Sequence, residues 1–164
     1  LLLKRSDLMA KPIIAVSACL CGIAVRYDGS SRTDARLERL WREGLALAVC
    51  PECMGGLRVP REPAERAADG RVIGCTGEDC TAAYAEGARQ TLALCRKYGI
   101  RAAVLKEGSP SCGSGEIYDG SFTGRRIPGE GVTAALLREQ GVEVYAEHNW
   151  EGLRPLLDRA ARES

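Results

Sequence analysis

Short apolar runs alternate with amphipathic segments along this chain of 164 residues. Four such runs predict buried strands, at 13–16, 45–49, 101–105 and 142–145. Between them, apolar residues recur at helical spacing and predict helices at about 33–43, 79–98 and 132–140, each followed by a glycine. We expect Asn149 to cap a last helix. Strands that alternate with helices predict an α/β, Rossmann-like three-layer domain, with a mostly parallel sheet and helices on both faces.

Two long segments interrupt this pattern. Residues 50–79 are rich in glycine and proline and predict an irregular stretch, in which Asp69-Gly70 is a hairpin turn. Residues 106–131 predict a glycine-rich loop. The length favours one domain. Met9 is a candidate native start, so we expect residues 1–8 to be a leader or vector-derived extension and residues 9–164 to form a single α/β domain.

Charge and composition narrow the classes of partner. The chain has 23 basic and 22 acidic residues, so no basic excess points to a nucleic-acid backbone. No apolar run approaches the ~20 residues of a membrane span, and the first residues do not resemble a secretion signal. The sequence therefore predicts a cytoplasmic protein with a small-molecule partner and no membrane. Its oligomeric state stays open.

Eight cysteines and a single histidine, His148, make up the candidate metal ligands and redox groups. Without a secretion signal, metal or redox chemistry is favoured over a disulfide framework. Cys19 and Cys50 each follow a predicted strand, and Cys112 lies in the loop after the third strand. Loops at the carboxyl ends of parallel strands share one edge, so these three thiols are expected to meet. They would hold an iron–sulfur cluster through three of its irons and leave one iron open.

Other interpretations of the cysteines remain open at this point. Cys50 and Cys53 form a C-x-x-C pair, typical of a redox site or half of a zinc site that Cys19 and Cys21 would complete. Cysteines also follow strands by chance. A further pair, Cys75 and Cys80, lies outside the expected site, and Cys95 falls on the apolar stripe of its helix and is predicted to be core; all are read from the sequence.

Several motifs occur in order between about residues 13 and 148. They are SACLCG with RYDG, CPE-x-x-GGL-x-x-PR-x-P-x-E, GSPSCG-x-G-x-IYDG-x-FTG, and G-x-GVTA. In these motifs the chain resembles the thiouracil desulfidase family, formerly a family of unknown function. The resemblance implies a Rossmann-like domain with a 4Fe-4S cluster held by Cys19, Cys50 and Cys112. It also implies removal of sulfur from thiolated uracil-type bases without net redox change. The chain departs from the family pattern at Cys21 and Cys53.

The implied reaction suggests roles for further residues. The open iron would bind the substrate sulfur. Glu52 lies two residues from Cys50 and is a candidate for proton transfer, with an ion pair to an arginine or a helix cap as the alternative role. Ser109 is a candidate to bond substrate or relay a proton. Thiolates leave such a cluster negatively charged, and Arg26, Arg61 and Arg125 are candidates to offset that charge.

Weaker candidates for substrate binding lie in the same loops. Ser111 would bond cluster or substrate, with loop capping as its simpler role. Asp28 and Asp119 would bond a uracil N–H, but each stands in an Asp-Gly turn signature. Three other functions compete with the desulfidase: a cluster-dependent sulfur transferase, a zinc-stabilised binding module, and a C-x-x-C oxidoreductase.

Overall fold

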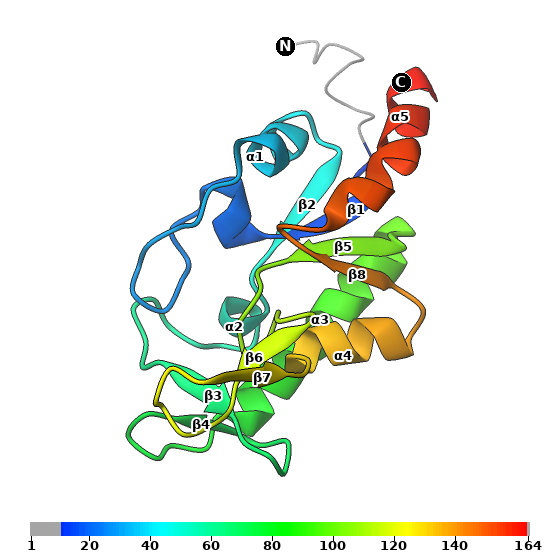
Figure 1. Cartoon of the computed structure of the whole chain (residues 1–164). Coiled ribbons are helices and arrows are strands. Elements are labelled where there is room, and N and C mark those ends of the chain that lie inside the picture. Colours follow the sequence, from blue (N-terminus) through cyan, green and yellow to red (C-terminus); the bar gives the residue numbers. More distant parts are fainter. Residues whose placement is uncertain (1–10, 164) are drawn as a thin grey trace.

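The computed structural model describes residues 11–163, so the predicted extension and the candidate start at Met9 lie outside the described residues. Its centre is a four-stranded parallel sheet with the strand order β2-β1-β5-β8 (Figure 1). The strands are β1 (Ile14–Ser17), β2 (Ala46–Val49), β5 (Ala102–Leu105) and β8 (Glu143–Ala146). The predicted parallel sheet is confirmed.

Side chains alternate between the two faces of the sheet, and each face has its own core. Ile14 and Val16 of β1 pack with Leu37 and Trp150, whereas Ala15 packs on the opposite side with residues such as Leu137. This period of two is the strand geometry that lets both faces be apolar. The predicted three-layer arrangement is therefore confirmed, with helices above and below the sheet (Figure 1).

The helices begin and end at local sequence signals. Asp34 accepts hydrogen bonds from the backbone N–H groups of Arg36 and Leu37 (2.9 and 3.3 Å) and caps the first helix. Gly99 follows the long central helix with a φ of +67°, a conformation that suits glycine. The longer helices are α1 (Ala35–Arg42), α3 (Thr81–Tyr98), α4 (Val132–Glu139) and α5 (Arg154–Glu163).

The two long loops contain more structure than the sequence predicted. The first holds a short helix, α2 (Pro51–Met54), and an antiparallel hairpin of β3 (Ala64–Arg66) and β4 (Val72–Gly74), with the predicted turn at Asp69-Gly70. The second holds another hairpin, β6 (Glu116–Tyr118) and β7 (Arg126–Pro128). Such short elements carry too few residues to show a hydrophobic period.

The expected role of Asn149 was wrong in detail. A 3₁₀ turn, Trp150–Leu153, precedes α5, and the Asn149 side chain makes no cap to it. Its Oδ1 instead accepts a hydrogen bond from the N–H of Ala146 at 2.8 Å, which closes the turn after β8. No helix among residues 11–163 is long and apolar enough to span a membrane.

Two glycines allow α2 to lie directly against α3. A Cβ on Gly87 would stand 1.8 Å from the carbonyl oxygen of Pro51, and one on Gly55 would stand 2.0 Å from the carbonyl oxygen of Ala83. No side chain fits at either position. The contact therefore sets the place of α2, which carries Glu52 and directly follows Cys50.

We expect Gly87→Ala to destabilise the fold by about 1–3 kcal/mol, because the new methyl group overlaps the Pro51 carbonyl. This opposes the usual gain of ~1 kcal/mol for alanine over glycine in a helix. Thermal unfolding followed by circular dichroism measures the difference. The control is Ala85→Gly at an exposed position of α3, which should lose only the helix propensity of alanine. A Gly87→Ala protein as stable as the wild type would contradict the close contact.

Candidate metal centre and active site

A cavity of about 510 Å³ lies at the carboxyl ends of β1, β2 and β5, and Cys19, Cys50 and Cys112 all line it. This size is typical of small-ligand sites. Ser17 pairs with Val49 in the parallel register, so the chain leaves β1 and β2 at the same level before Cys19 and Cys50. Three cysteines from three separate loops therefore line one cavity, and their binding of a cluster stays a prediction.

Ser109 shapes the turn that presents Cys112. Its Oγ accepts hydrogen bonds from the backbone N–H groups of Ser111 and Cys112 (3.1 and 3.0 Å). The N–H of Gly113 donates to the carbonyl of Ser109 at 2.9 Å and closes the turn. The Cys112 side chain is thus directed by a local hydrogen-bonded turn, although it stands in a loop of glycines and serines.

Burial raises the pKa of all three thiols. The pKa of Cys19 rises to about 11, although the positive charges of Lys106 and Arg26 oppose the shift. The pKa of Cys50 rises to about 12, again mainly through burial. Burial also raises the pKa of Cys112, whereas a hydrogen bond from Ser17 favours its thiolate. A bound metal deprotonates coordinating thiols, which offsets this cost of burial.

The donor set fits an iron–sulfur cluster better than a single ion. Across residues 11–163, no three His, Cys, Asp or Glu side chains converge to share one metal ion. A 4Fe-4S cluster makes a different demand, because each thiolate binds its own iron and the thiols stand apart. Three soft sulfur donors around one cavity, with the cations of Lys106 and Arg26 in its wall, meet that demand.

Glu52 lines the cavity from α2 as part of a largely buried ion pair. Arg61 lies 2.5 Å from its Oε2, and the two side chains are only 9% and 13% exposed. The hydroxyl of Ser109 donates to the other oxygen, Oε1, at 3.4 Å. Arg61 also donates to the backbone carbonyl of Val25 at 3.0 Å, so the pair joins two loops of the site. Glu52 therefore pairs with an arginine and also lines the cavity, so the two roles considered for it do not exclude each other.

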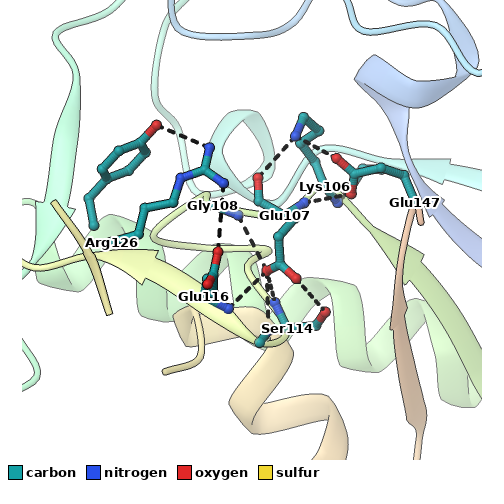
Figure 2. A network of polar contacts seen from close by, with 10 residues as sticks. Lys106, Glu107, Gly108, Ser114, Glu116, Arg126 and Glu147 are labelled. Carbon is teal, nitrogen blue, oxygen red and sulfur yellow. Dashed lines mark hydrogen bonds and ion pairs between the residues drawn. The ribbon is translucent and has the colours of Figure 1, made fainter. Parts of the chain in front are cut away.

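A second carboxylate organises the loop that carries Cys112 (Figure 2). Oε1 of Glu107 accepts hydrogen bonds from four backbone N–H groups, at 2.8–3.3 Å, and Oε2 accepts one from the Ser114 hydroxyl at 3.4 Å. Burial alone would raise its pKa, but these N–H groups outweigh burial and hold the pKa below the usual 4.5. Glu147 in turn binds the Lys106 ammonium (2.6 Å) and the Glu107 N–H (2.8 Å).

The remaining predicted substrate-binding residues are not among the described residues that line the cavity. Ser111 is fully buried, and its hydroxyl is 2.8 Å from that of Thr133 at the start of α4. Asp28 accepts hydrogen bonds from Ser30, and Asp119 accepts them from Ser121, in local turns. Their contact with a substrate stays a prediction, and the structure gives each of them a local role.

The candidate arginines and extra cysteines lie at different depths. Arg26 and Arg61 line the cavity, whereas Arg125 has a side chain 75% exposed and pairs with Asp119 at 3.9 Å.

Cys95 is part of the hydrophobic core, as predicted. The other four cysteines lie in separate surroundings. Cys21 is buried in the core that contains Leu37 and Trp150, and Cys53 is 4.0 Å from Arg61. Cys75 donates to Glu62 at 2.7 Å, and Cys80 precedes α3.

Sequence reasoning missed several residues of the site. Lys106, Glu107 and Glu147 follow strands β5 and β8 directly, so the position after a strand was an available signal. Tyr84 on α3 also lines the cavity and is 3% exposed. Its ring falls on an apolar helical stripe, where the sequence does not separate a core tyrosine from a site tyrosine.

A parallel α/β domain with three thiols at one sheet edge defines a class of cysteine-ligated metalloproteins. The model of the 2-thiouracil desulfurase family matches residues 14–149, and the chain belongs to that family. It is 51% identical to a solved [4Fe-4S]-dependent thiouracil desulfidase, TudS, with a TM-score of 0.84 over 90% of this chain and 99% of that one. It is also 44% identical to the uncharacterized protein YbbK of Bacillus subtilis (strain 168), over 83% of this chain and 96% of that protein.

We expect Glu107→Gln to lower the thermal midpoint at pH 7 by a few degrees, because an amide cannot replace the carboxylate as acceptor of four N–H groups. The pKa of Glu107 is lowered on folding, so its contribution is present above pH 4.5 and is lost as the pH falls through the lowered pKa. The difference between variant and wild type should therefore shrink in acid.

Thermal unfolding at pH 7 and below pH 4.5 measures this difference. The matched control is Glu116→Gln, a carboxylate of the same loop that is 57% exposed and lies 3.8 Å from Arg126. Such an exposed pair contributes little, so this variant should unfold close to the wild type at both pH values. A Glu107→Gln difference that does not change with pH would contradict the role of the charge.

Proposed function

We propose that this protein removes sulfur from thiouracil-type bases with a 4Fe-4S cluster bound by Cys19, Cys50 and Cys112. One observation carries the proposal: thiols from three strand ends line one cavity together with Glu52 and Ser109. Membership of the 2-thiouracil desulfurase family and the likeness to a solved [4Fe-4S]-dependent enzyme support it. The single histidine leaves carboxylate and hydroxyl groups as the candidates for proton transfer.

The reaction is a hydrolysis without electron transfer. One water adds to the thiocarbonyl carbon, the C=S group becomes C=O, and the sulfur leaves as hydrogen sulfide. When bound, the cluster supplies a soft Lewis acid for the substrate sulfur at the iron without a protein ligand. The residues of this chain then have to bind the base, hold the water and move its protons.

Glu52 is the proton-transfer group in this proposal. Two nitrogens of Arg61 bind Oε2 of Glu52, at 2.5 and 2.6 Å. The other carboxylate oxygen, Oε1, has no bond to Arg61 and accepts a hydrogen bond from Ser109. Oε1 accepts a proton from the attacking water and returns it to the departing sulfur. Ser109 donates to Oε1 and keeps the carboxylate in place, while the same oxygen of Ser109 holds the Cys112 turn.

The surroundings of the thiols agree with a reducing compartment. All eight cysteines are free thiols, and all lie within the described residues. A cluster bound by three thiolates needs those thiols in their reduced state. We therefore propose the cytoplasm as the site of action.

Serine at Cys19, Cys50 or Cys112 should each abolish cluster binding and sulfide release. In each variant a hard serine oxygen replaces a soft thiolate ligand, and the two remaining thiolates bind an iron–sulfur cluster poorly. Anaerobic reconstitution with iron and sulfide, followed by iron and acid-labile sulfide assays, measures the cluster. Sulfide release from 2-thiouracil and 4-thiouracil measures the activity.

Cys75→Ser is the control, because this exposed thiol bonds only Glu62 and should leave both quantities unchanged. Cys21→Ser and Cys53→Ser test the two additional thiols. Full cluster content in any of the three ligand variants would refute the ligand set. Bound zinc in place of iron in the purified protein would favour a binding module.

Glu52→Gln should retain the cluster and lose activity, with kcat about 10²-fold lower or more. Glutamine keeps the shape and an acceptor for Arg61 but cannot take up the proton of the attacking water. Single-turnover sulfide release measures the effect. Glu62→Gln is matched to it, since Glu62 also lines the cavity but bonds Cys75. Similar activities for the two variants would remove Glu52 from the reaction.

A further inference from the structure

The only phenylalanine of the chain stands in the wall of the cavity. Phe122 is 40% exposed, which is unusual for a large apolar side chain, and it belongs to neither hydrophobic core. Its backbone has a φ of +57°, in the left-handed region that costs a bulky residue free energy. Packing of the fold therefore does not explain why an aromatic residue stands at this position.

A buried carboxylate holds this turn in place. Glu65 of β3 is 8% exposed, and its Oε1 accepts hydrogen bonds from the backbone N–H groups of Gly120 and Phe122 (3.1 and 3.3 Å). The β6–β7 turn is thus joined to the other hairpin through its own backbone N–H groups and the Glu65 carboxylate. Strain that persists because its surroundings determine it is typical of functional positions.

The ring of Phe122 is the free aromatic surface of the cavity. The ring of Tyr27 faces the guanidinium of Arg26 at 5.7 Å, and that of Tyr118 faces Arg126 at 5.1 Å. Within residues 11–163, no cation and no other ring lies over Phe122. Tyr84, the remaining ring in the wall of the cavity, is only 3% exposed. Among the described residues that line the cavity, Phe122 therefore offers a flat ligand an exposed ring with no cation over it.

The residues that line the cavity differ in how deeply they are buried. Cys19 and Cys112 are 8% and 6% exposed, whereas Phe122 is 40% exposed, and all three line the cavity. The difference in exposure indicates that the two thiols lie deeper, at the floor of the cavity, and that Phe122 lies nearer the opening. A thiocarbonyl that reaches the floor leaves the rest of its planar ring nearer to the opening. We propose that Phe122 is a substrate-binding residue whose ring stacks on the thiolated base. This inference rests on the proposed function and adds to it the contact that orients the base.

Stacking of this kind has a defined kinetic signature. Loss of an aromatic ring under a base weakens binding by about 5- to 150-fold. Phe122 lies away from the floor, so it contacts substrate and transition state alike, and its loss should raise KM and leave kcat within about twofold. Affinity for uracil, the product, should fall by the same factor as KM rises.

The experiment compares three variants of the cluster-loaded protein. Phe122→Gly removes the ring and suits a φ of +57°, so the turn keeps its conformation. Phe122→Tyr restores an aromatic face and should restore KM. Trp41→Leu is the control, since Trp41 is a 37% exposed aromatic residue of α1 that is not among the described residues lining the cavity. KM and kcat with 2-thiouracil, uracil binding by calorimetry, and iron content are measured for each.

A raised KM, weaker uracil binding and unchanged iron content in Phe122→Gly, restored in Phe122→Tyr, would establish the stacking contact. Unchanged KM and unchanged uracil affinity in Phe122→Gly would overturn the stacking contact and leave the desulfidase function intact. Loss of iron in Phe122→Gly would also overturn it, because the residue would then have a structural role. Absence of sulfide release from the loaded wild-type protein would overturn the proposed function and this inference together.

Discussion

The parallel pairing of β1 with its two neighbours is the constraint on which the site depends. Val16 pairs with Val104 on one side, and Ser17 pairs with Val49 on the other. Because the strands run in one direction, their carboxyl ends meet at one edge, where loops far apart in sequence converge. Slippage of one strand by a residue would exchange its two faces and move its following loop, so both cores and the thiols rely on the same register.

Three carboxylates, one buried and two partly buried, order the irregular parts of the loops around the cavity. Glu52 accepts hydrogen bonds from an arginine and a serine. Glu65 accepts them from two backbone amides of one turn, and Glu107 accepts them from four backbone amides of its own loop. Each carboxylate satisfies groups that a glycine-rich loop would otherwise leave without partners. The loops are therefore ordered by a few charged side chains, which explains how so many glycines coexist with defined cysteine positions.

The sequence was sufficient for the parts of the structure that follow local rules. Sheet, principal helices and the edge shared by Cys19, Cys50 and Cys112 could be predicted, since apolar period and strand direction determine them. The partners of Glu107 could not, because they lie one to nine residues further along a glycine-rich loop, and no hydrophobic period indicates that this loop curls back over the carboxylate. Ser111 was misleading for a related reason: its neighbour Cys112 lines the cavity, yet its own side chain turns to Thr133.

The Glu65 carboxylate accepts hydrogen bonds from backbone amides of the β6–β7 turn and so joins the two hairpins beside the cavity. Exchange of a side chain in that turn leaves these hydrogen bonds in place. A protein built in this way separates the part that performs chemistry from the part that selects what reaches it. Under the proposed stacking of Phe122 on the base, a change of this single exposed ring would alter the substrate preference without rebuilding the interior.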